Sequence, residues 1–262
     1  MERHFAEFLA QRGFAALIVR RKQLRLLPDE GFEQIEEYLR TSVIRLRLAL
    51  DWAQTRKEID PERIGTLGLS LGGVLNAVLA GLDNRPKAHV IALAGGNLAD
   101  VICYTHDRQI KRYRQQFMKR NHLTLEELRW HLRQVIKTDP MYFAHYVGPK
   151  NVLFFIAWFD RIIGRKYSRK LAKALGNPER YYFPLGHHSS VLMLPFVRVG
   201  AFRFFEERLK KVPQGETARP AFWRQEVPPR RRPPTLPDRQ PKPAEVSQGK
   251  PSLSQSTKLP PR

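Results

Sequence analysis

The chain has 262 residues, enough for one domain that buries most of its apolar surface in a single core. Its 46 Lys+Arg against 25 Asp+Glu give a formal net charge of +21. This excess favours anionic partners such as nucleic acid, anionic lipid or acidic substrates, although a basic tail or a basic host proteome would also produce it. The single cysteine, Cys103, excludes an intrachain disulfide and is expected to be a buried, inert thiol.

No stretch of the sequence approaches the roughly 20 apolar residues that a membrane helix needs. The most apolar run, 152–159, has the length of a buried strand. The first residues, MERHFAEFLAQRGF, include acidic side chains and lack the apolar core of a secretory signal. A cytoplasmic protein is therefore expected.

Short apolar runs alternate with longer amphipathic ones. Strands are predicted over 14–19, 64–69, 88–93, 152–158 and 180–183. Helices are predicted over 2–12, 30–56, 71–82, 124–137, 166–175 and 195–210. Apolar runs without polar alternation are typical of strands buried on both faces, as in a parallel sheet. The alternation predicts an α/β fold with a doubly wound, mostly parallel sheet.

The composition changes after Lys211. Residues 211–262 hold 12 of the 20 prolines, and 11 Lys+Arg against four Asp+Glu. This segment has too little apolar surface to offset the entropy of ordering, so it is expected to be a disordered basic tail of polyproline character. The predicted organisation is one folded domain over 1–210, followed by this tail.

The strongest motif is GLSLGG at residues 68–73, between a predicted strand and a predicted helix. A serine in such a motif lies on a sharp strand-to-helix turn that holds its hydroxyl above the sheet edge. Side chains at Gly68 and Gly72 are expected to clash in this turn. The helix start directs free N–H groups to Ser70, and that of Leu71 is predicted to be the first oxyanion donor. The alternative interpretation is a turn of small residues that serves only helix packing, because such a turn can have the same sequence.

A serine nucleophile needs a base, and the base needs an acid that orients it. Asp160 directly follows the predicted strand VLFFIAWF, and His187 follows the next strand in YYFPLGHHSS. Their order along the chain is the order Ser, Asp, His of hydrolases with a parallel sheet. Capping of the following helix is the alternative role for Asp160, and a surface loop is the alternative for the histidines. His188 is the reserve base, and Asp139 is expected to be a turn residue.

Four segments together resemble the α/β-hydrolase superfamily, most closely its dienelactone hydrolases, acetyl esterases and prolyl-oligopeptidase-like enzymes. They are ALDWAQTRKEIDPERIGTLGLSLGG, DPMYF, FFIAWFDRII and FPLGHHSS. The resemblance covers about residues 2–210. It implies Ser70 as nucleophile, Asp160 as acid and His187 as base, and hydrolysis of esters or amides through an acyl-enzyme without a cofactor or a metal.

Two features depart from this family. The acid segment lacks the glycine that usually precedes the Asp and the Val-Pro that follows it. In addition, Met1 lies next to the segment that matches the family's first helix. The strand and the loop with the second oxyanion donor, which precede that helix in the family, are therefore missing from this sequence. We therefore expect a start upstream of Met1 in a longer reading frame, and an α/β-hydrolase sheet that lacks its first strands.

Residues 98–137 form a long connection that is interpreted as a helical cap insertion. Its basic residues indicate either a lid that favours an anionic substrate or a solvated helical face, and the solvated face is the preferred interpretation. Three aromatic residues are candidates for an acyl pocket or, preferably, for core packing: Tyr104, Trp130 and Tyr142.

The sequence thus predicts a serine hydrolase acting on a small-molecule ester, with peptidase activity as a neighbouring alternative. A second hypothesis is a catalytically impaired hydrolase fold that binds an acidic partner or a membrane through its basic surface and tail. The chain has no aromatic-interleaved nucleic-acid motif. Its oligomeric state is not indicated by the sequence.

Overall fold

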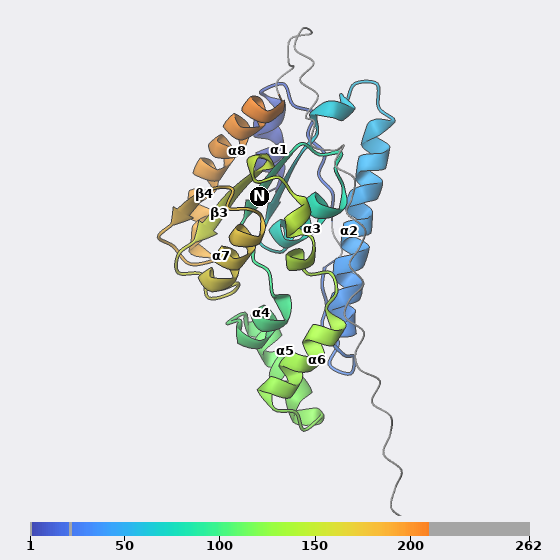
Figure 1. The fold of residues 1–262 in the computed structure, drawn as a ribbon, viewed down its shortest axis with the longest axis vertical. Coiled ribbons are helices and arrows are strands. Elements are labelled where there is room, and N and C mark those ends of the chain that lie inside the picture. Colours follow the sequence, from blue (N-terminus) through green and yellow to red (C-terminus); the bar gives the residue numbers. More distant parts are fainter. Residues whose placement is uncertain (1, 21–22, 210–262) are drawn as a thin grey trace, which may run out of the picture. The chain divides into compact units, whose positions relative to one another are not determined.

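The sheet contains four parallel strands in the spatial order β1-β2-β3-β4. They are β1 Gly65–Leu69, β2 Ala88–Ala92, β3 Val152–Ala157 and β4 Glu179–Phe183. The structure, a computed structural model, describes residues 2–20 and 23–209 (Figure 1). The predicted α/β fold with a mostly parallel sheet is confirmed, whereas the predicted basic tail lies outside the described residues.

Eight α-helices are present in the described part of the chain. They are α1 Glu2–Ala10, α2 Glu33–Gln54, α3 Leu71–Leu82, α4 Leu98–Tyr104, α5 Arg108–Arg120, α6 Leu125–Val135, α7 Arg165–Ala174 and α8 Leu194–Leu209. Short 3₁₀ turns are η1 Pro61–Arg63, η2 Pro140–Tyr142, η3 Ala144–Tyr146, η4 Pro149–Asn151 and η5 Ser189–Met193. None of these helices is long and apolar enough to cross a bilayer.

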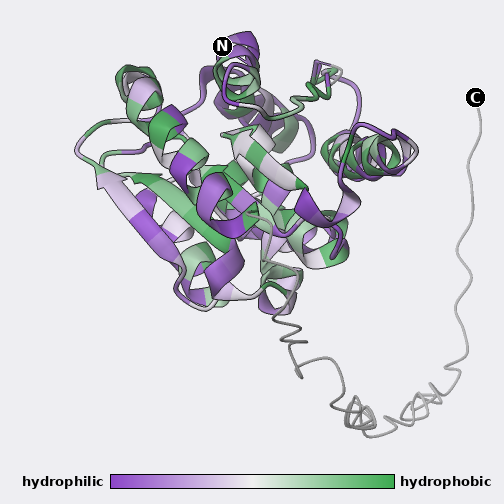
Figure 2. Ribbon diagram, turned by 90° about the horizontal axis from the view of Figure 1, so that it is seen from above, coloured by the Kyte–Doolittle hydropathy of each residue, from purple (hydrophilic) through white to green (hydrophobic). Residues whose placement is uncertain are grey.

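Side chains of β3 alternate between two apolar cores, one on each face of the sheet. Phe154 and Ile156 pack with α2, α3 and α7, whereas Leu153 and Phe155 pack with α1 and α8. Both central strands, β2 and β3, are fully buried, because helices cover both faces. Figure 2 shows hydrophobic residues along these strands and many hydrophilic residues on the surrounding helices. The continuous apolar runs thus reflect a doubly covered sheet.

The strand predicted over 14–19 is wrong. These residues form no strand, and Leu17 is half exposed. An apolar run becomes a strand only where a neighbouring strand accepts its backbone hydrogen bonds. No strand that the structure describes pairs with this segment. Its apolar content is used instead at Phe14, whose ring packs edge-on against Phe202 of α8 at 6.1 Å.

The insertion predicted over 98–137 contains α4, α5 and α6, which lie together beside the N-terminal end of α2 (Figure 1). Local capping defines two of these helices: Asp107 accepts the Ile110 N–H, and Thr124 forms a capping box with Glu127. Phe32, before α2, packs edge-on against Tyr113 at 5.0 Å. The insertion is therefore anchored to the main core by aromatic packing.

Candidate active site

Ser70 lies between the end of β1 and the first turn of α3, with φ 54° and ψ −122°. This backbone conformation is rare for a residue with a side chain and is retained only where the surroundings enforce it. Two hydrogen bonds do so here. The Ser70 N–H donates to the carbonyl of Ala92 in β2 at 2.8 Å, and the Ser70 carbonyl accepts from the Val74 N–H at 3.0 Å. The sheet and the helix together hold the serine at the strand end.

The glycines around Ser70 differ in how much space each leaves for a side chain. A Cβ on Gly68 would overlap the carbonyl oxygen of Gly72, and a Cβ on Gly73 would lie 2.7 Å from the carbonyl oxygen of Ala92. A Cβ on Gly72 would meet nothing within 4 Å, so the expected clash at this position is wrong. The close approaches occur where the turn folds back on β1 and where α3 crosses β2, and Gly72 faces neither.

Asp160 is buried at the end of the connection that continues β3. Its Oδ1 accepts the N–H groups of Ile162 at 2.8 Å and Ile163 at 2.9 Å, and its Oδ2 lies 2.8 Å from His187 Nδ1. Burial acts to raise the pKa of Asp160, but the bonds from His187 and the two backbone donors outweigh it and keep this pKa below its ordinary value. The alternative role for Asp160, capping of the following helix, is wrong: the N-cap of α7 is Gly164, and Asp160 holds only the turn before it while it also bonds to His187.

His187 lies on the loop after β4, and hydrogen bonds within that loop define its position. The Gly186 carbonyl accepts from Ser190 Oγ at 2.7 Å, and the Gly186 N–H donates to Ser189 Oγ at 2.9 Å. Backbone bonds from Trp158 and Phe159 extend the pairing of the two chain segments beyond β3 and β4. The loop thus runs alongside the segment that carries Asp160.

Three of the predicted residues form one hydrogen-bonded chain. Ser70 Oγ lies 2.8 Å from His187 Nε2, and His187 Nδ1 lies 2.8 Å from Asp160 Oδ2. The His187 and Asp160 side chains are 8% and 1% exposed, so the pair is shielded from water. Such an arrangement can transfer the serine proton to the imidazole while the carboxylate stabilises the resulting positive charge. Leu71 begins α3, and the first N–H groups of a helix have no acceptor within the helix.

The reserve base and the turn residue occupy other positions. The His188 ring is exposed and lies 5.5 Å from the His187 ring, centre to centre, so the structure brings His187 rather than His188 to Ser70. Asp139 is buried and accepts the N–H groups of Asn97 and Leu98 at the start of α4. Its burial raises its pKa. This Asp therefore joins two loops near the strand ends.

Core packing, the preferred interpretation for the three aromatic candidates, is wrong. Tyr104, Trp130 and Tyr142 are 46%, 67% and 52% exposed. Their helices present these side chains outward, and Tyr104 lines a pocket. Cys103 is buried, and burial raises the pKa of its thiol to about 11, as expected of an inert cysteine. No group of three or more potential metal ligands occurs among residues 2–20 and 23–209.

A cluster of polar side chains in the elements that flank the serine turn was not predicted from the sequence. Thr66 Oγ1 donates to Asn76 Oδ1 at 2.7 Å and lies 2.8 Å from His89 Nδ1, while Asn76 Nδ2 donates to the Val90 carbonyl at 2.9 Å. These contacts join β1, β2 and α3, the three elements between which Ser70 is held. The signal in the sequence was a polar residue inside each of three apolar runs.

Comparisons with known proteins point to one fold. No family model matches the chain. The protein YtaP of Bacillus subtilis (strain 168) is 48% identical over 42 residues, which are 16% of this chain and 14% of YtaP. The acetyl xylan esterase of Paenibacillus sp. R4 superimposes with a TM-score of 0.56 at 24% identity, over 66% of this chain and 54% of the esterase.

Two peptidase structures give similar matches. The acylaminoacyl peptidase of Pyrococcus horikoshii has a TM-score of 0.50 at 19% identity, over 67% of this chain and 29% of the peptidase. A puromycin-hydrolyzing peptidase of Mycobacterium tuberculosis has a TM-score of 0.50 at 18% identity, over 66% and 26% of the two chains. The chain thus spans about half the length of the esterase and less than a third of either peptidase. With its parallel sheet and the serine turn after β1, the chain has the fold of the α/β-hydrolase superfamily.

Proposed function

We propose that this protein is a serine hydrolase that cleaves carboxylic esters, with Ser70 as the nucleophile. The observation that carries the proposal is the chain of two 2.8 Å hydrogen bonds from Ser70 through His187 to Asp160. Three residues distant in sequence meet at the end of one sheet, in the geometry that nucleophilic catalysis by serine requires. The esterase and peptidases with the same fold support hydrolysis of an ester or an amide.

In the proposed mechanism, Ser70 Oγ attacks the carbonyl carbon of the ester while His187 Nε2 takes the hydroxyl proton. The oxyanion that forms on the substrate accepts a hydrogen bond from the Leu71 N–H at the start of α3. The protonated His187 then donates the proton to the departing alcohol, which leaves an acyl group on Ser70. Water, deprotonated by His187, releases the acid and restores the serine.

Asp160 has a positioning and electrostatic role in this scheme. Its lowered pKa keeps the carboxylate ionised at neutral pH, and its bond to Nδ1 leaves Nε2 of His187 directed at Ser70. The Ile162 and Ile163 N–H groups hold the other carboxylate oxygen, so the acid does not rotate during the reaction. The base is therefore oriented before the substrate arrives.

A fluorophosphonate probe tests the proposal directly, because such probes react with activated serines. We expect covalent labelling of the full chain, and loss of that labelling in Ser70→Ala. Ser42→Ala removes a buried serine from α2 and serves as the matched control, which retains labelling. Absence of labelling in the full chain, or labelling that survives Ser70→Ala, contradicts the proposal and favours a binding role for the fold.

Rates on 4-nitrophenyl esters and on the corresponding 4-nitroanilides separate esterase from peptidase activity. We expect the esters to be cleaved faster, because 4-nitrophenolate is a far better leaving group than the anilide nitrogen, which cannot leave until His187 has protonated it. A higher kcat/KM on anilides would assign the site to amide hydrolysis instead.

A further inference from the structure

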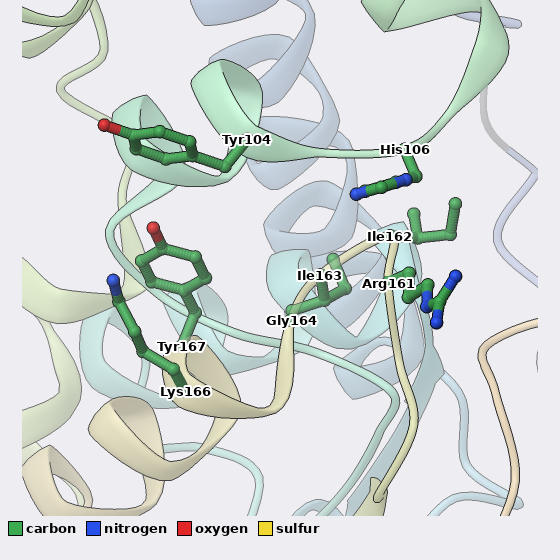
Figure 3. Close-up of a pocket in the computed structure, with 8 residues that line it drawn as sticks. All are labelled: Tyr104, His106, Arg161, Ile162, Ile163, Gly164, Lys166 and Tyr167. Atoms are coloured by element: carbon green, nitrogen blue, oxygen red, sulfur yellow. The ribbon is translucent and has the colours of Figure 1, made fainter.

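A pocket of about 400 Å³ opens between the α4–α5 connection and the loop that follows Asp160 (Figure 3). Its walls are Tyr104, His106, Arg161, Ile162, Ile163, Gly164, Lys166 and Tyr167. The backbone N–H of His106 donates to the Arg161 carbonyl at 3.0 Å, which joins the two sides of the pocket. This volume is in the range of small-molecule sites.

The pocket shares its wall with the candidate active site. Ile162 and Ile163 line it, and their N–H groups are the donors that hold Asp160 Oδ1. Ile163 also packs closely on Gly95, where a Cβ would lie 2.5 Å from its Cγ2. Gly95 follows β2, whose last residue binds the Ser70 N–H. The pocket therefore borders the turn that holds Asp160 and, through Ile163, the segment that follows β2.

The charges of the pocket are of one sign. Arg161 and Lys166 contribute two cations, and no Asp or Glu is among the described residues that line it. Neither cation takes part in an ion pair within the described ranges. Lys166 lies beside Tyr167 on the side of the pocket that also carries Tyr104, whereas Arg161 lies on the opposite side, next to Ile162 (Figure 3).

The acidic residues nearby are already engaged. Asp160 is bonded to His187, and Asp100, whose charge acts on Tyr167, is paired with Arg129 and Arg133. The pocket also lies at the N-terminal end of the ten-residue helix α7, where the helix dipole favours negative charge. The unpaired cations and the helix end act in the same direction.

We propose that this pocket receives an oxyanionic group of the substrate, so that the enzyme prefers esters carrying a carboxylate or phosphate near the scissile bond. The inference rests on the proposed hydrolase function, which it deepens by naming a substrate class. A carboxylate or phosphate accepts charge-assisted hydrogen bonds either from Lys166, with the tyrosine hydroxyls on the same side as further donors, or from Arg161 on the opposite side of the pocket. The apolar Ile162 and Ile163 side chains contact the carbon chain that connects this group to the ester.

Matched ester pairs that differ by one negative charge test the proposal. On the acyl side, 4-nitrophenyl hydrogen adipate is compared with 4-nitrophenyl hexanoate. On the alcohol side, the butyrate ester of 4-hydroxybenzoate is compared with that of 4-hydroxybenzamide. After correction for spontaneous hydrolysis, we expect kcat/KM of the anionic member to be at least about tenfold higher in one of the two pairs. The ratio falls with rising ionic strength, because salt screens the attraction.

Variants that remove the two positive charges test whether the pocket causes the preference for anionic esters. In the double variant Arg161→Gln/Lys166→Gln, the anionic-to-neutral ratio is expected to fall about tenfold. The control Lys150→Gln/Lys173→Gln removes the same charge from exposed positions outside the pocket and keeps the ratio. Labelling of the double variant by an uncharged fluorophosphonate shows that its active site is still folded.

Each outcome bears on a different claim. Ratios near one in both pairs, or equal changes in the two double variants, overturn the anionic preference while the hydrolase function stands. Inert neutral esters together with absent labelling of the full chain overturn the proposed function, and the inference with it. A fallen ratio on the acyl pair assigns the pocket to the acid part of the substrate, and a fallen ratio on the other pair assigns it to the alcohol part.

Discussion

At the sheet edge, Ser70 and Asp160 are held mainly by backbone groups: a strand carbonyl, turn N–H groups and a glycine that permits close approach. In the α4–α6 insertion, by contrast, the one buried carboxylate is held by other side chains. Asp100 of α4 is buried and is bonded to Arg129 and to Arg133 of α6. Backbone positions change little when a side chain is replaced, whereas a side-chain pair depends on both partners.

The two regions are therefore expected to respond differently to substitution. Substitutions that alter the backbone of the sheet edge are expected to remove function and stability together. Substitutions in the insertion are expected to cost stability without reaching the chemistry. Four experiments test this contrast, in order of decreasing expected effect.

Asp160→Asn is expected to reduce kcat on a neutral 4-nitrophenyl ester by about 10⁴-fold, because an amide neither stabilises the charged imidazole nor maintains its tautomer. Asp107→Asn, in the insertion, is the matched control. Asp107 caps α5 through the Ile110 N–H, and Asn caps as well as Asp, so activity and stability should be retained. Activity of Asp160→Asn within tenfold of the unmodified protein would refute the proposed role of this carboxylate.

Gly68→Ala is expected to lower the free energy of unfolding by about 3 kcal/mol or more and to abolish probe labelling, because the new methyl group would overlap the Gly72 carbonyl. Gly72→Ala introduces the same methyl group four residues later, in open space within α3. It should be neutral or stabilising, since Ala is the better helix former by about 1 kcal/mol. Urea unfolding of both variants checks the prediction, and equal losses would contradict it.

His89 is buried, and burial lowers its pKa to about 4 from an ordinary value of 6.5. Between these values the unfolded chain binds a proton that the folded chain does not, so stability is retained above pH 6.5 and lost as the pH falls toward 4. The loss from this group amounts to about 3 kcal/mol over the window.

His89→Gln should remove this component, so that its unfolding free energy falls less than that of the unmodified protein between pH 7 and pH 4.5. Urea unfolding at several pH values measures the slope. His4→Gln replaces an exposed histidine and should leave the slope unchanged. Identical slopes for all three proteins would show that His89 does not titrate in this way.

Asp100→Asn is expected to cost about 1–3 kcal/mol of stability, because Arg129 and Arg133 lose the carboxylate they share. The hydrogen bond from Arg129 keeps the pKa of Asp100 below its ordinary value, so its contribution is present at neutral pH and is lost as the pH falls below the carboxyl range. Glu126→Gln alters an exposed partner of Arg129 and should cost less than about 0.5 kcal/mol.

The contrast between the two regions requires that Asp100→Asn retains the labelling rate of Ser70. A labelling rate that falls in parallel with stability would show that the insertion also positions the active site.

The serine turn was predictable because its cause is local. A strand, a tight turn and an apolar helix within about 20 residues determine where Ser70 lies, and sterics over a few bonds require a small residue at Gly68. Asp160 and His187 were predictable as well, since the carboxyl ends of parallel strands meet at one edge. The four strands of the sheet and most of the helices followed from the apolar patterns, but α4 and α5 of the insertion were not among the predicted helices.

Other features depended on contacts between distant parts of the chain. Residues 14–19 have the composition of a strand but pair with none that the structure describes. The freedom at Gly72 follows from the path of α3 over β2. Whether Tyr104 packs in the core or lines a pocket with Arg161 depends on how α4 meets the loop after Asp160.

The amino-acid sequence by itself determined the α/β class, the serine turn and the order of the three candidate catalytic residues, because these depend on local sterics and on the direction of parallel strands. Contacts between distant segments decided that His187 rather than His188 reaches Ser70, and that Tyr104 and His106 of the insertion meet Arg161 and Lys166 around one pocket. Both outcomes require the packing of segments far apart in the chain, which no local pattern encodes.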